Sequence, residues 1–299
     1  MDYIKELANQ VKTSNQAYWE KCLRKWLVAT VACAIEPGIV NQTVLILKGP
    51  QGCGKSTFLE GLMPTILKDY YYGGALDPNN KDAVVNLAEC LIINLDELES
   101  LTKYKEAALK EIITKNAIRI RRPYATHAEN LYRRASFVGS VNTNQILSDS
   151  TGSRRFLIHE VASVNYQHTV DMDKVWKQAY DLYLSGFIFH FNQAEIKDIN
   201  CRNDAFEIVK PEEELLLARF KHGDSQKYGA LSMTTTDILK VLHNDRLPGN
   251  SRSEAIKLGL ALAKHEFPYI MVGKVRKYIV QRVSCDDDFS ISLKGDTNA

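Results

Sequence analysis

The residue pattern with the clearest chemistry is a glycine-rich segment near residue 50. It matches every fixed position of G-x-x-x-x-G-K-[ST]. Its glycines let successive backbone N–H groups turn inward around a phosphate, its lysine reaches the outer phosphates, and its serine hydroxyl can ligate Mg²⁺. The alternative is a glycine-rich turn that binds nothing. We expect ATP with Mg²⁺, held by Gly49, Pro50, Gln51, Gly52, Cys53, Gly54, Lys55, Ser56 and Thr57.

An acidic pair bears on whether a bound triphosphate is hydrolysed. Asp96 and Glu97 directly follow the apolar run 90–95. We expect Asp96 to hold Mg²⁺ through its water shell and Glu97 to activate the attacking water. Small-molecule kinases generally lack an acid in that role. The alternative is that both acids only cap the helix after them.

Two further polar groups point to hydrolysis at a subunit interface. Asn142 follows the apolar run 135–141 and can hold the attacking water, with Asn144 as the alternative and a plain turn as the bland explanation. Arg154 and Arg155 precede the next apolar run. One of them can stabilise transition-state charge on the γ-phosphate of a neighbouring subunit. A surface arginine pair in a salt bridge is the alternative.

The segment from Arg119 to Arg134 is strongly basic on a chain whose formal net charge is only +2. It contains five arginines and one glutamate, and Pro123 favours a turn or a sheet edge. Arginine beside an aromatic ring suits a phosphate backbone and unpaired bases. The candidate nucleic-acid contacts are Arg121, Arg122, Tyr124 and His127. The alternatives are a solvated basic face or arginines that serve the nucleotide.

The elements that position these residues follow from the apolar periodicity. Residues 1–40 are expected to be helical up to Glu36-Pro37-Gly38, and short branched apolar runs predict buried strands of a parallel sheet. Strands alternating with helices give an α/β sheet with right-handed crossovers. The strands are expected at 43–47, 90–95, 135–141 and 156–158, and the helices at 56–67 and 102–115.

The composition changes near residue 210. One helix is expected to start after Lys210, and two more are expected at 235–243 and 253–264. Two β-like runs follow, at 269–272 and 278–283. This order is typical of a winged helix-turn-helix, which binds DNA or protein. Its basic residues are Arg252, Lys257, Lys264, Lys274, Arg276 and Lys277. The expected organisation is an N-terminal helical segment 1–40, an ATPase domain 41–205, a winged-helix-like domain 206–285 and a flexible tail 286–299.

The cysteines and the apolar runs bear on the compartment. Six cysteines occur without C-x-x-C spacing, and Cys53 lies inside the glycine-rich segment, where a disulfide would hinder nucleotide entry. The longest apolar run near the N-terminus, 27–35, is far shorter than the roughly 20 residues that cross a bilayer. We therefore expect a reducing, cytoplasmic location and no membrane contact.

The motifs in combination resemble a known family. The strings GPQGCGKST, LIINLDELESL, IRRPYATHAENLYRRASFVGSVNTNQIL and TGSRRF resemble the virulence-associated protein E family over residues 40–160, and the rest of the chain resembles it loosely. Those are P-loop proteins of phages and genomic islands, similar to superfamily 3 helicases and to the helicase part of viral primase-helicases.

The resemblance implies an AAA+-like P-loop NTPase that assembles as a hexameric ring, with ATP between subunits. Lys55, Ser56, Asp96 and Glu97 then match the two Walker motifs, Asn142 matches the sensor position, and Arg154 or Arg155 matches the arginine finger. The segment 121–134 corresponds to the hairpin that grips single-stranded DNA. A central lysine-histidine pair is not obvious there, and His127 is the nearest match.

Many relatives carry a primase domain upstream. Only 48 residues precede the glycine-rich segment, so we expect primase activity to be absent or supplied by a partner. The leading hypothesis is an ATP-dependent helicase that acts on single-stranded or forked DNA in replication of a phage or mobile element. The alternatives are a non-motor ATPase switch, regulatory or defensive, and a P-loop kinase.

Overall fold

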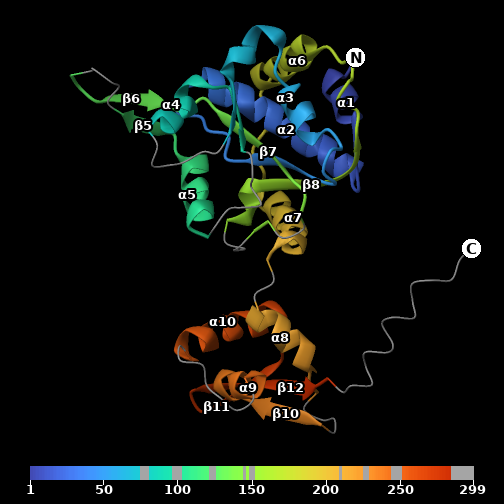
Figure 1. Ribbon diagram of the computed structural model, residues 1–299, viewed down its shortest axis with the longest axis vertical. Coiled ribbons are helices and arrows are strands. Elements are labelled where there is room, and N and C mark those ends of the chain that lie inside the picture. Colours follow the sequence, from blue (N-terminus) through green and yellow to red (C-terminus); the bar gives the residue numbers. More distant parts are fainter. Residues whose placement is uncertain are drawn as a thin grey trace, which may run out of the picture. The chain divides into compact units, whose positions relative to one another are not determined.

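The structure is a computed structural model that describes residues 1–74, 81–95, 103–120, 126–143, 146–147, 152–208, 211–224, 229–243 and 251–283. The chain forms two compact units, Met1–Ile208 and Val209–Ala299 (Figure 1). The division lies three residues beyond the boundary expected at 205, and residues 1–40 belong to the first unit rather than standing apart from it.

A six-stranded mixed sheet is the centre of the first unit, in the order β1-β8-β2-β7-β4-β3. Strands β8, β2, β7, β4 and β3 run parallel, and β1 pairs antiparallel with β8. The parallel strands expected from the apolar runs are confirmed, whereas the short β1 and the glycine-containing β3 were not expected. The strands are β1 Val11–Thr13, β2 Val44–Lys48, β3 Tyr71–Gly74, β4 Ile92–Leu95, β7 Ser136–Val141 and β8 Phe156–Val164.

Helices cover both faces of this sheet, as its continuous apolar strands require. Leu45 and Leu47 of β2 lie in one core cluster together with residues of α1, α2, α3 and α6. The alternate residues Val44 and Ile46 lie in a second cluster with residues of α4 and α5. The helices are α1 Tyr3–Ala8, α2 Gln16–Ile35, α3 Lys55–Glu60, α4 Lys81–Glu89, α5 Lys103–Thr114, α6 Met172–Leu184 and α7 Gln193–Asn203.

Two of these helices test the expected boundaries. Helix α2 starts after Asn15, whose side chain accepts a hydrogen bond from the Tyr18 N–H, and it ends before Glu36 as expected. The single helix expected over 56–67 is wrong beyond residue 60. Pro64 cannot continue a helix, and the chain turns there into the 3₁₀ helix η1, Thr65–Tyr70.

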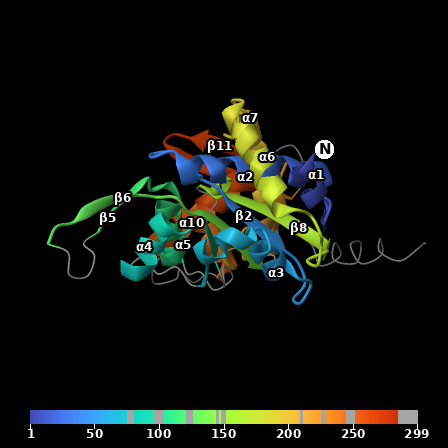
Figure 2. The same ribbon diagram turned by 90° about the horizontal axis from the view of Figure 1, so that it is seen from above.

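The basic segment forms the arms of a hairpin. Strand β5, Ala117–Ile120, pairs antiparallel with β6, Glu129–Tyr132. The hairpin extends away from the rest of the first unit (Figure 2).

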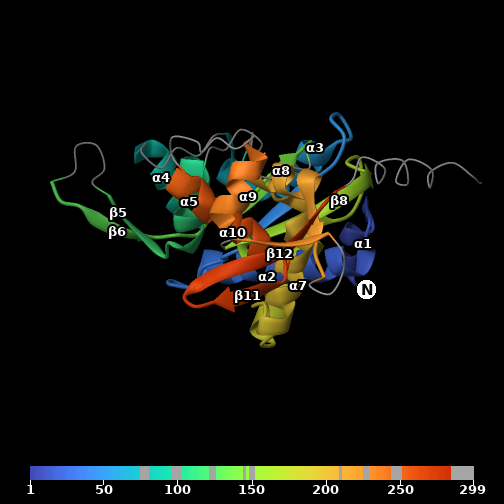
Figure 3. The ribbon, with the colours of Figure 1, turned by 90° about the horizontal axis from the view of Figure 1, so that it is seen from below.

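The second unit contains the three expected helices: α8 Pro211–Arg219, α9 Thr235–Leu242 and α10 Ser251–Lys264. Strands β11, Tyr269–Val272, and β12, Val275–Arg282, lie side by side as the expected hairpin (Figure 3). The expected two-stranded wing was incomplete, because β9, Phe220–His222, and β10, Ala230–Met233, also pair with β12. None of the described helices in either unit is long and apolar enough to cross a bilayer.

A buried histidine on β8 makes the stability of the first unit depend on pH. The His159 ring packs against Tyr18 and Trp19, with ring centroids 5.1 and 4.9 Å away, and its Nε2 has no hydrogen-bond partner among the described residues. Burial, with a smaller contribution from the charge of Arg202, lowers the pKa of His159 to about 3. The folded chain therefore keeps this ring neutral where an unfolded chain protonates it.

Stability of the first unit should fall as the pH drops below about 6.5, the ordinary histidine value, because only the unfolded His159 gains a proton there. Between pH 7 and pH 5 the wild-type chain should lose about 2 kcal/mol more than a His159→Phe variant. Urea unfolding followed by tryptophan fluorescence measures this unit alone, since Trp19, Trp26 and Trp176 all lie within it. Equal losses in both proteins would show that the folded ring protonates normally.

Candidate functional site

The segment Gly49–Ser56, hereafter the Gly49–Ser56 loop, joins the end of β2 to the start of α3. Gly52 and Gly54 have φ angles of +80° and +89°, which side chains other than glycine rarely adopt. A Cβ on Gly49 would lie 2.9 Å from the Val161 carbonyl oxygen. The backbone path of the loop therefore depends on glycine at these positions. The loop lies at the carboxyl edge of the parallel strands, where open α/β sheets bind ligands.

Lys55 links this loop to the end of a neighbouring strand. Its side chain is buried, and Nζ donates to the carbonyl oxygens of Gly49 at 2.8 Å and Pro50 at 2.7 Å. Nζ also lies 3.1 Å from Oδ1 of Asn142. Because β2 and β7 pair in parallel with Lys48 beside Val141, both expected site residues reach the same edge. The structure thus brings Lys55 and Asn142 together.

Ser56 lies beside a residue that the sequence did not single out. Its exposed hydroxyl is 3.0 Å from the hydroxyl of Ser140, which precedes Asn142 by two positions on β7. The sequence does contain a signal for Ser140, because it is a polar residue near the carboxyl end of the same predicted strand that Asn142 follows. Asp96 and Glu97 lie outside the described residues. The strand before them, β4, ends at Leu95 beside Gly139, close to this edge.

Arg154 and Arg155 lie at the opposite edge of the sheet from Lys55. The first residue of β8, Phe156, lies beside Val44 at the start of β2, whereas Lys48 at the end of β2 pairs with Glu160. At about 3.3 Å per residue, roughly 20 Å of strand separates the arginine pair from the level of Gly49. The structure therefore does not bring these arginines to the Gly49–Ser56 loop of the same chain.

The two arginines differ in their surroundings. Arg155 turns back, and its Nη1 lies 3.4 Å from the Gly152 carbonyl oxygen. Burial, followed by the charge of Arg154, lowers the pKa of the Arg155 guanidinium. Arg154 is exposed, and its guanidinium has no hydrogen-bond or ion-pair partner among the described residues. Arg154 is thus the one whose side chain is available to a second molecule.

Helix α7 fixes the turn that carries these arginines. Asn203 donates to the carbonyl oxygens of Ser153 at 2.7 Å and Phe156 at 2.9 Å, on either side of the pair. The Ser153 hydroxyl in turn donates to the Asn200 side chain at 3.0 Å. The turn, the 3₁₀ helix η3 Ser153–Arg155, is therefore bound to one face of α7.

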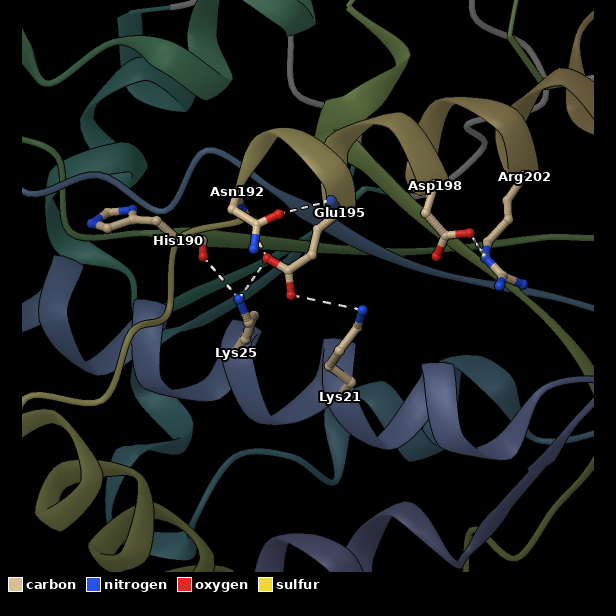
Figure 4. Close-up of polar contacts among 7 residues, drawn as sticks. All are labelled: Lys21, Lys25, His190, Asn192, Glu195, Asp198 and Arg202. Atoms are coloured by element: carbon tan, nitrogen blue, oxygen red, sulfur yellow. Dashed lines mark hydrogen bonds and ion pairs between the residues drawn. The ribbon is translucent and has the colours of Figure 1, made fainter.

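Ion pairs attach α7 to α2, as Figure 4 shows. Lys25 is buried, and its Nζ donates to the His190 carbonyl oxygen at 2.8 Å and pairs with Glu195 at 2.9 Å. Lys21 approaches the same carboxylate at 3.7 Å, and Glu195 also forms the capping box at Asn192. Opposing its burial, these hydrogen bonds and charges hold the pKa of Glu195 below its ordinary value. The arginine turn is thus supported from α2 through α7.

Comparison with known proteins shows the family of this chain. The model of the virulence-associated protein E-like domain matches residues 1–208, which are the first compact unit. The chain belongs to this family. The resemblance drawn from the motifs is therefore confirmed, and we call residues 1–208 the virulence-associated protein E-like domain. No curated protein matches the chain significantly.

Several solved structures are similar at low identity. The apo structure of the NrS-1 C-terminal region is 14% identical, with a TM-score of 0.48 over 94% of this chain and 76% of that one. Two A-form apo structures of the same region are each 15% identical over 94% of this chain. Their TM-scores are 0.48 and 0.46, over 75% and 76% of those chains.

The basic hairpin of the virulence-associated protein E-like domain contains one arginine that is not a surface residue. Arg133 is 1% exposed, and its guanidinium donates to the carbonyl oxygens of Ile112, Ile113 and Asn41. It also lies 5.0 Å from the centre of the Phe137 ring. Arg133 adds to the formal charge of the segment but not to its surface, and its partners are distant backbone groups that local sequence does not reveal.

The other basic residues of this segment differ in their surroundings. Arg134 is exposed and donates to the Ala34 carbonyl oxygen, and Arg119 and His127 are also exposed. Three of the candidate nucleic-acid contacts, Arg121, Arg122 and Tyr124, lie outside the described residues. Among the described arginines of this segment, Arg119 on the hairpin and Arg134 at its base are therefore both exposed.

In the second unit, part of the expected basic surface is neutralised. Lys257 pairs with Glu212 and Lys264 pairs with Glu213, each at 3.0 Å. The cations on the β11–β12 hairpin are Lys274, Arg276 and Lys277, and no acid lies between residues 269 and 283. The β11–β12 hairpin therefore carries three cations and no acid.

Replacing Arg133 with Ala should destabilise the virulence-associated protein E-like domain by at least about 3 kcal/mol, because buried carbonyl groups lose their donor and a cavity remains. Replacing the exposed Arg119 on the same hairpin should change stability by no more than about 0.5 kcal/mol. Urea unfolding by tryptophan fluorescence compares the two variants. Similar stabilities would mean that Arg133 is solvated after all.

Proposed function

We propose that this chain is an ATPase that hydrolyses ATP between subunits of a ring and moves along DNA during replication of a phage or other mobile element. The observation that carries the proposal is the contact of Lys55 with Asn142, inside a complete G-x-x-x-x-G-K-S match. Membership of the virulence-associated protein E-like family, which resembles superfamily 3 helicases, supports the helicase part of the proposal.

The residues of the Gly49–Ser56 loop fit a magnesium triphosphate. The Lys55 ammonium is held by neutral oxygens and has no carboxylate among its hydrogen-bond partners in the described part of the chain, so phosphate oxygens can replace them and gain a charge-assisted bond. The exposed Ser56 hydroxyl suits a magnesium ligand, and Asp96, which directly follows β4 in the sequence, would hold the ion. Mg²⁺, when bound, would offset the negative charge of the phosphate oxygens.

The chemistry assigned to the remaining residues follows their positions. Asn142, at the end of β7, orients the attacking water, and Glu97 accepts its proton. Arg154 reaches the γ-phosphate in a neighbouring copy, because it is exposed, lacks a partner among the described residues and lies at the other edge of the sheet. Arg155 holds the turn. A head-to-tail contact of this kind repeats around a ring.

Mixing inactive subunits tests the shared site. Lys55→Ala and Arg154→Ala should each abolish hydrolysis in a uniform assembly. An equal mixture should recover about a quarter of the wild-type rate, since a quarter of the head-to-tail interfaces combine an intact lysine with an intact arginine. The steady-state rate of phosphate release measures this recovery.

The control mixes Lys55→Ala with the double variant Lys55→Ala/Arg154→Ala, in which no interface is intact. Recovery there would reveal contaminating activity. If the first mixture stays inactive although its subunits exchange, the two residues do not act across an interface.

A second experiment separates a DNA motor from a non-motor switch. Replacing Arg121, Arg122 and His127 with Ala should leave basal hydrolysis within about twofold and remove most of its stimulation by single-stranded DNA, because stacking and phosphate contacts are lost. Hydrolysis is measured with and without DNA. The control variant Lys174→Ala/Lys177→Ala loses exposed charges on α6 instead and should keep the stimulation.

A wild-type chain whose hydrolysis responds to no single-stranded or forked DNA would contradict the motor and favour the switch. A hairpin variant that keeps full stimulation would show that DNA is bound elsewhere.

A further inference from the structure

The segment between β8 and α6 lies against the Gly49–Ser56 loop. A Cβ placed on Gly54 would be 2.2 Å from Cδ1 and 2.9 Å from Cγ of Tyr166, so the aromatic ring rests directly on the Gly54 backbone. Gly54 is the residue immediately before Lys55. The side chain of Tyr166 therefore touches the loop next to the lysine proposed to bind phosphate.

The scaffold holds Tyr166 from both sides. The Asn165 backbone N–H donates to the Gln10 carbonyl oxygen at 2.8 Å, and its side-chain amide donates to the Gln10 side chain at 2.9 Å. Two residues beyond Tyr166, the His168 ring packs edge-on against Phe58 of α3, with ring centroids 5.7 Å apart. These contacts fix the backbone that carries the tyrosine relative to the start of α3.

Tyr166 is nevertheless 46% exposed as a residue, and its hydroxyl has no hydrogen-bond partner in the part of the chain that the structure describes. A tyrosine that serves packing alone buries its ring, and a buried hydroxyl finds a partner. Here a rigidly placed aromatic face is left open to solvent beside a phosphate-binding lysine. That combination suits a flat ligand group that stacks.

We propose that Tyr166 stacks on the base of the nucleotide whose phosphates Lys55 binds. The inference rests on the proposed function, because the loop must first hold a triphosphate. The nucleotide is then held at two points, the phosphates by the loop and the base by the ring of Tyr166. Since every base has a π face, this contact binds purines without selecting adenine over guanine.

Binding of two probes separates the base from the phosphates. Dissociation constants for a non-hydrolysable ATP analogue and for inorganic tripolyphosphate, both with Mg²⁺, are measured by calorimetry on the full chain. Tyr166→Leu keeps bulk on Gly54 without a π face and should weaken the ATP analogue about tenfold, while tripolyphosphate changes less than about twofold. Tyr166→Ala should behave in the same way, and Tyr166→Phe should bind both probes like the wild type.

The matched control is Tyr180→Ala, which removes an exposed tyrosine from α6 and should change neither constant. A guanosine analogue should lose affinity with Tyr166→Leu to the same extent as the ATP analogue. Equal weakening of the ATP analogue and tripolyphosphate would show that the ring supports the loop and would overturn stacking. Tighter binding of both probes would mean that the ring covers the loop, and this result would overturn stacking as well.

Failure of the proposed function gives a different result. The wild-type chain would then bind neither probe, or Lys55→Ala would bind both as tightly as the wild type. A chain that loses both probes with Lys55→Ala but shows no change with Tyr166→Leu keeps the proposed function and rejects the stacking.

Discussion

The parallel pairing of β2 with both β7 and β8 is the constraint on which the rest of the first unit depends. Val44 lies beside Phe137 on one side and Phe156 on the other, and this register continues to the end of β2. A shift by one residue would turn every β2 side chain to the other face and exchange Leu45 and Leu47 of one core cluster with Val44 and Ile46 of the other. The register therefore fixes which residues stand at each edge of the sheet.

The two edges receive different chemistry from that register. At the carboxyl edge, glycine-dependent backbone and the contact between Lys55 and Asn142 gather polar groups around one loop. At the amino edge, α7 and its ion pairs with α2 hold a turn that presents Arg154. The described residues that build both edges belong to the virulence-associated protein E-like domain.

Patterns that depend on near neighbours in the sequence predicted most of the fold. The branched apolar runs located β2, β4, β7 and β8, and the loop motif located Lys55, because strand burial and glycine torsions are local properties. The contact of Lys55 with Asn142 followed from strand order, which the sequence alone does not state. The sequence did not reveal that Arg133 is buried, because its guanidinium binds carbonyl oxygens about 20 and 92 residues away. It did not reveal that Tyr166 is exposed beside the Gly49–Ser56 loop, because that position depends on the path of the segment after β8. Three-residue strands such as β1 and β9 carry too few side chains for a periodic signal.

Strand β8 sets the distance between the arginine turn and Tyr166. It carries the arginine turn directly before its first residue and Tyr166 two positions after its last, and it contains nine residues. A straight strand of that length spans about 30 Å. This one strand therefore sets the distance between Arg154, which would act in a neighbouring subunit, and Tyr166, which would contact the nucleotide of its own subunit. Loops elsewhere in the domain can lengthen without changing this spacing, whereas one residue added within the first half of β8 would move the two groups apart and turn them to opposite faces.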